Sequence, residues 1–79
     1  MEIKVLGTGC QKCLTLEKTV TDTARELGIE ADISKVDDIV DIMNYGVMRT
    51  PGLVINGKVV LSGRLPSAAE LKEILTQNK

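Results

Sequence analysis

The sequence predicts an α/β fold in which a four-stranded mixed sheet is flanked by helices, in the element order β-α-β-α-β-β-α. Three observations predict it. Residues 3–6 form a short apolar run that leads, through a glycine-containing turn, into a segment with helical spacing of apolar residues. A second apolar strand follows, and the resulting β-α-β unit implies a parallel strand pair. Later, two apolar runs flank Asn56-Gly57, a strong signal for a tight hairpin and an antiparallel pair.

The first half of the chain carries the β-α-β unit. Gly7 and Gly9 mark the turn after the strand at residues 3–6. The helix that follows has its apolar stripe at spacings of four, four and three residues, formed by Leu16, Val20, Ala24 and Leu27. Gly28 is typical of a helix C-terminal stop, and residues 30–36 are expected to form the second strand.

The second half begins with a short helix. Asp37 and Asp38 supply an N-cap and a favourable early charge. The side chains expected to point inward from this helix are Ile39, Ile42 and Met43. Residues 53–55 and 58–61 are the hairpin strands. Residues 67–70, Ser-Ala-Ala-Glu, form a capping box that opens a last helix with an apolar face of Leu71, Ile74 and Leu75.

Composition bounds the class of protein. The 79 residues predict one domain, 1–79, whose core must be aliphatic because Phe and Trp are absent and Tyr45 is the single aromatic residue. Met43 and Met48 are expected to fill that core. The formal charge is −1, with no basic patch that would indicate a nucleic-acid surface and no apolar run of membrane-spanning length. A strand that begins directly after the first residues leaves no signal peptide, so we expect a cytoplasmic protein.

The two cysteines, Cys10 and Cys13, lie two residues apart at the expected start of the first helix. Unpaired backbone N–H groups and the positive end of the helix dipole favour a thiolate there. A second thiol one turn further on can resolve the mixed disulfide that such a thiolate forms. A bridge between them closes too small a loop to serve as a structural staple. The motif therefore predicts a thiol–disulfide redox site.

The cysteines are not expected to be equivalent. Cys13 extends the buried stripe of Leu16, whereas Cys10 precedes it at or before the first helical position, where it can meet solvent. We assign Cys10 as the attacking nucleophile and Cys13 as the resolving thiol. Lys12 stands between them, and we interpret it either as a tuning charge that lowers the pKa of Cys10 or as a solvated side chain of the first turn.

With these elements in place, the whole chain resembles the thioredoxin fold, and most closely the small, glutaredoxin-sized prokaryotic redox-active disulfide proteins. The features that carry the resemblance are the Cys-x-x-Cys motif after the first strand, the element order, and Thr50-Pro51 before the hairpin. In that family the matching proline is cis and faces the dithiol. The resemblance implies that Pro51 and Thr50 shape a substrate groove, and that Gly63 lies near its mouth.

The resemblance implies a monomeric dithiol oxidoreductase without an organic cofactor, acting on protein or small-molecule disulfides. Gln11-Lys12 lie between the cysteines, where typical thioredoxins have Gly-Pro and typical glutaredoxins Pro-Tyr. Residues 62–65 replace the glycine pair with which glutaredoxins hold glutathione. The electron donor therefore stays open between a dithiol reductase and glutathione, as does the direction of electron flow.

Two other classes of function stay open at this point. Residues 4–13 also resemble the loop in which heavy-metal-associated domains hold Cu(I) between two thiolates. Those domains have the order β-α-β-β-α-β, and Thr8 stands where their loops usually carry Met. Zinc would lack two ligands, because the chain has no His and no further Cys. The third possibility is a redox-inactive interaction module.

Overall fold

The computed structural model of the chain describes residues 1–9 and 11–78. The elements are β1 (Glu2–Leu6), α1 (Gln11–Glu26), β2 (Asp32–Val36), α2 (Ile39–Asn44), β3 (Gly52–Ile55), β4 (Lys58–Ser62) and α3 (Ala68–Gln77). The predicted order is confirmed. It differs from that of the heavy-metal-associated domains, because α2 lies between β2 and the hairpin and the last element is a helix.

The sheet has four strands in the order β2-β1-β3-β4. β1 pairs with β2 in parallel, whereas β1 with β3 and β3 with β4 are antiparallel, so the sheet is mixed as predicted. The hairpin turn has positive φ at both central residues, 51° at Asn56 and 82° at Gly57, which is the geometry that an Asn-Gly pair favours.

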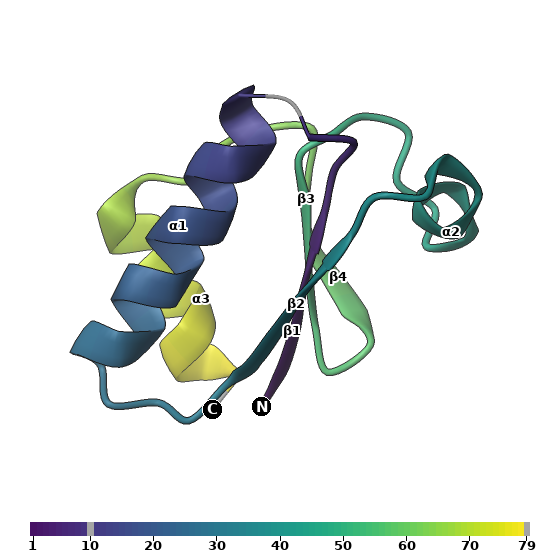
Figure 1. The fold of residues 1–79 in the computed structure, drawn as a ribbon. Coiled ribbons are helices and arrows are strands. Elements are labelled where there is room, and N and C mark those ends of the chain that lie inside the picture. Colours follow the sequence, from purple (N-terminus) through teal and green to yellow (C-terminus); the bar gives the residue numbers. More distant parts are fainter. Residues whose placement is uncertain (10, 79) are drawn as a thin grey trace.

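Figure 1 shows α1 and α3 on one side of the sheet and α2 on the other. Alternate residues of β1, Ile3 and Val5, point toward α1 and α3, as the period of two in a strand requires. They join a cluster that we call the large core. Its buried members are Ile3, Val5, Leu16, Val20, Ala24, Leu53, Ile55, Leu61, Leu71 and Leu75.

The opposite face carries a smaller cluster, the small core, made of Leu6, Ile42, Val47 and Val54. Ile42 is the buried residue of α2, as predicted. The prediction was wrong for Ile39 and Met43, which are 62% and 60% exposed, and for Met48, which is 86% exposed. For Ile39 and Met43 the reason is the length of α2, because a helix of six residues makes fewer than two turns and offers little surface to the sheet. Met48 lies in the loop that follows this helix.

The N-caps predicted for α2 and α3 are present in the structure. The Asp38 side chain caps α2 by accepting a hydrogen bond from the Val40 N–H at 2.8 Å. Ser67 likewise caps α3 by accepting from the Glu70 N–H at 3.1 Å. In a full capping box the Glu70 carboxylate would also accept a hydrogen bond from the backbone N–H of Ser67. Here the Glu70 carboxylate instead accepts two hydrogen bonds from Arg64, at 2.6 and 2.7 Å. None of the helices in the described part of the chain has the length and apolar character that crossing a membrane requires.

Candidate functional site

Cys13 lies in the first turn of α1 and is 1% exposed. It begins the buried stripe that continues through Leu16 and Val20, as the sequence predicts. Cys13 is disulfide-bonded. Cys10, the predicted nucleophile, lies outside the described residues. The structure therefore places the expected resolving cysteine at the base of the helix, shielded from solvent.

Gly7 connects β1 to the loop before α1 and packs directly on Cys13. Its N–H donates a hydrogen bond to the carbonyl of Val36 at 2.9 Å, which extends the parallel pairing of β1 and β2 by one residue. A Cβ atom at this position would lie 2.6 Å from the Cβ of Cys13 and closer still to its Sγ. The sequence indicated only a turn here. The contact with Cys13 is not visible from the sequence because it depends on how β1 and α1 pack.

The segment before β3 brings Thr50, Pro51 and Gly63 together. The Thr50–Pro51 peptide bond is cis, and the Pro51 side chain is buried. The Gly63 N–H donates a hydrogen bond to the Pro51 carbonyl at 2.9 Å. Gly63 has φ of 77°, and a Cβ there would lie 3.0 Å from the Cβ of Arg49. Gly63 therefore lies against the loop that carries Thr50 and is hydrogen-bonded to Pro51.

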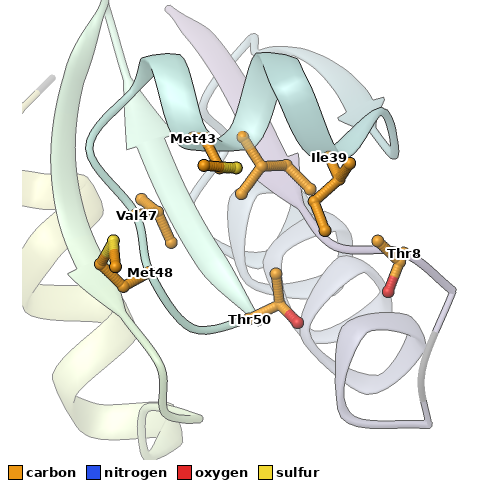
Figure 2. Close-up of a pocket in the computed structure, with 7 residues that line it drawn as sticks. Thr8, Ile39, Met43, Val47, Met48 and Thr50 are labelled. Atoms are coloured by element: carbon orange, nitrogen blue, oxygen red, sulfur yellow. The ribbon is translucent and has the colours of Figure 1, made fainter.

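A cavity of about 220 Å³ opens between α2, this loop and the segment that leads into α1. Figure 2 shows Thr8 and Thr50 together at the end nearest that segment, with the side chains of α2 and the following loop along the rest. The lining residues are Thr8, Ile39, Ile42, Met43, Val47, Met48 and Thr50. The exposed side chains of Ile39, Met43 and Met48 thus line a cavity instead of filling the core.

The charged groups around the site are exposed. Lys12 is exposed on the first turn of α1, and Asp37, Asp38 and Asp41 are exposed at the start of α2. Tyr45 does not border the cavity. Its hydroxyl accepts a hydrogen bond from Lys4 Nζ at 3.1 Å. That hydrogen bond, followed by the contact with Glu2, raises the pKa of Lys4 above its usual value.

Sequence comparisons agree with this geometry. Residues 1–76 match a family model described as a thioredoxin domain. A thioredoxin of Methanothermobacter thermautotrophicus is 38% identical over 76 residues, which cover 96% of this chain and 99% of the relative. A thioredoxin of Methanocaldococcus jannaschii is 41% identical over 73 residues, covering 92% of this chain and 84% of the relative.

Proposed function

Because this chain belongs to the thioredoxin family and is a disulfide oxidoreductase, we propose that it reduces or exchanges disulfides through a Cys10–Cys13 couple. The observation that supports this most is Cys13 itself, which is disulfide-bonded and buried at the first turn of α1. A cysteine pair at a helix start is suited to exchange, because the helix dipole stabilises the attacking thiolate.

In the proposed reaction the Cys10 thiolate attacks one sulfur of the substrate disulfide, and the other substrate sulfur leaves as a thiolate and takes up a proton. Cys13 then attacks the Cys10 sulfur of the mixed disulfide. The Cys10–Cys13 bond forms and the second substrate sulfur leaves. The substrate gains two electrons, and the protein is oxidised by two. Lys12, exposed between the cysteines, is proposed to tune the Cys10 thiolate.

Thr50, Pro51 and Gly63 are proposed to form the substrate side of the site. Thr50 lines the apolar cavity beside Thr8, and Gly63 holds the Pro51 carbonyl. A cavity lined by Ile39, Met43 and Met48 suits an apolar side chain of a protein that presents its disulfide at the mouth. We propose protein disulfides as the main substrates, with small-molecule disulfides also accepted.

We propose a single domain over residues 1–79 that acts as a cytoplasmic monomer without an organic cofactor. A dithiol reductase or glutathione would return the two electrons to the Cys10–Cys13 disulfide. Titration against glutathione and dithiol buffers would identify a competent donor and fix the reduction potential.

Variants of the two cysteines test the proposed roles. Cys10→Ser should abolish disulfide reduction, whereas Cys13→Ser should retain the first attack and accumulate mixed disulfides. Alkylation of the reduced protein at mildly acid pH should label Cys10 before the buried Cys13. Earlier labelling of Cys13, or trapping of substrate by Cys10→Ser, would reverse the assignment. Stoichiometric metal in the purified protein without disulfide turnover would favour a metal carrier.

A further inference from the structure

We propose that Gly7 is a positioning residue that favours the disulfide form of Cys13, an inference that rests on the proposed Cys10–Cys13 couple. Gly7 is buried, and a Cβ there would lie 2.6 Å from the Cβ of Cys13 and nearer still to Sγ. Real Cβ atoms do not approach this closely, so Cys13 can occupy its position only because residue 7 has no side chain.

The backbone of Gly7 cannot easily withdraw. Its N–H donates a hydrogen bond to the Val36 carbonyl at 2.9 Å. The preceding Leu6 is paired with Val36 on β2 and with Gly52 on β3. Gly7 is therefore held by β2 at the end of a central strand whose last residue is paired on both sides. The φ angle of Gly7 is not positive, so an alanine at this position would cause no backbone strain. Any effect of Gly7→Ala therefore comes from the contact of the new methyl group with Cys13.

That contact distinguishes the two redox states. In the disulfide, the Sγ of Cys13 is bonded and cannot turn away from residue 7. In the dithiol, rotation about the Cα–Cβ bond moves Sγ aside, and only the overlap with the Cβ of Cys13 remains. A side chain at residue 7 therefore destabilises the oxidised protein more than the reduced protein. The same overlap arises when Cys13 attacks the mixed disulfide, so resolution should also slow.

The test is the equilibrium with glutathione, in which the protein dithiol and glutathione disulfide give the protein disulfide and two molecules of glutathione. For Gly7→Ala, the equilibrium constant for oxidation should fall by about fivefold or more, since overpacking a rigid site is costly. Mixed disulfides with a protein substrate should persist longer than in the wild type. Gly28→Ala is the control, because it strains a residue with φ of 67° in an open position beyond the other end of α1. It should lower stability and leave the constant unchanged.

If Gly7→Ala does not fold, the same substitution is made in the Cys13→Ala background, which removes Sγ and keeps only the overlap with the Cβ of residue 13. Relative to Cys13→Ala, the double variant should lose less free energy of unfolding than Gly7→Ala costs the oxidised wild type, and an equal or larger loss would overturn the proposal. An unchanged equilibrium constant in folded Gly7→Ala would also overturn it while leaving the proposed function intact. A wild-type protein that forms no reversible disulfide would instead contradict the proposed function itself.

Discussion

On the face of the sheet that α1 and α3 cover, the described chain buries ten apolar residues in one cluster, whereas on the α2 face it buries four. The alternation along the strands divides the two sets. Val5 and Leu53 are paired and belong to the large core, and the neighbouring Leu6 and Val54 belong to the small core. The same strands therefore build two layers of very different extent.

The two faces divide the main core and the candidate site between them in a chain of 79 residues. The α1/α3 face buries its apolar side chains against long helices, so most of the hydrophobic stabilisation arises there. On the α2 face, apolar side chains stay exposed and line the cavity beside Thr8 and Thr50. Under the proposed function, a short helix that leaves these side chains exposed would provide a docking surface at little expense to the fold.

The largest expected effect comes from truncating the large core. Leu71→Ala should lower the free energy of unfolding by about 2–5 kcal/mol, because Leu71 is 0% exposed and its loss leaves a cavity. The free energy of unfolding for a domain of this size is about 4–12 kcal/mol, so Leu71→Ala should be only marginally stable. Ile39→Ala, at a side chain 62% exposed, should stay within about 0.5 kcal/mol of the wild type. Urea unfolding measures both, and comparable losses would contradict the contrast between the faces.

The next effect concerns the cavity side of α2. Met43→Ser should raise KM for a protein disulfide by about fivefold, since a docked apolar side chain loses part of its buried contact area. Its stability should stay near that of the wild type, because Met43 is 60% exposed. Exchange with a small disulfide that does not fill the cavity should be unaffected.

Val40→Ser is a matched control on the same helix. Val40 is 61% exposed and is not among the residues that line the cavity. We expect this variant to bind and turn over the protein substrate like the wild type. An equal rise in KM for Val40→Ser would show that the whole apolar surface of α2 docks the substrate. No change for Met43→Ser would remove the cavity from the proposed groove.

The sequence predicts the α1/α3 face far better than the α2 face. The stripe of Leu16, Val20 and Ala24 and the Asn56-Gly57 hairpin are local patterns, and each was confirmed. Ile39 and Met43 have helical spacing too, but the spacing does not say how much sheet lies under a helix of six residues. The packing of Gly7 on Cys13 depends on two elements meeting, which no local pattern encodes.

The start of α3 was also only partly predictable. Ser67 caps the helix as the sequence indicates, but the Glu70 carboxylate binds Arg64 in place of the capping-box N–H. A bidentate bond to a guanidinium is charge-assisted and therefore stronger than one to a neutral N–H. Arg64 directly follows Gly63, which holds Pro51. The pair thus links the helix of the large core to the edge of the candidate site.

The smallest expected effect is the pH dependence of this pair. The hydrogen bond from Arg64 is the main cause that lowers the pKa of Glu70 below its usual 4.5, and the same contact raises the pKa of Arg64. Because the carboxylate form is favoured in the folded state, its contribution to stability is present above pH 4.5 and is lost as the pH falls through the lower folded pKa. Glu70→Gln should therefore lower the Tm slightly at pH 7, and the difference from the wild type should disappear once the pH has fallen below the lowered pKa of Glu70.

The Arg64→Gln variant shows whether the pair, and not the carboxylate alone, is responsible. It should lower the Tm at pH 7 by a similar small amount, and the double variant should be little worse than either single one, because each removes the same interaction. Since Glu70 also lies in the first turn of α3, a remaining effect of Glu70→Gln in the Arg64→Gln background measures its interaction with the helix dipole. Additive losses would mean that the two side chains act independently, and the link between α3 and the edge that carries Gly63 would then rest on the backbone alone.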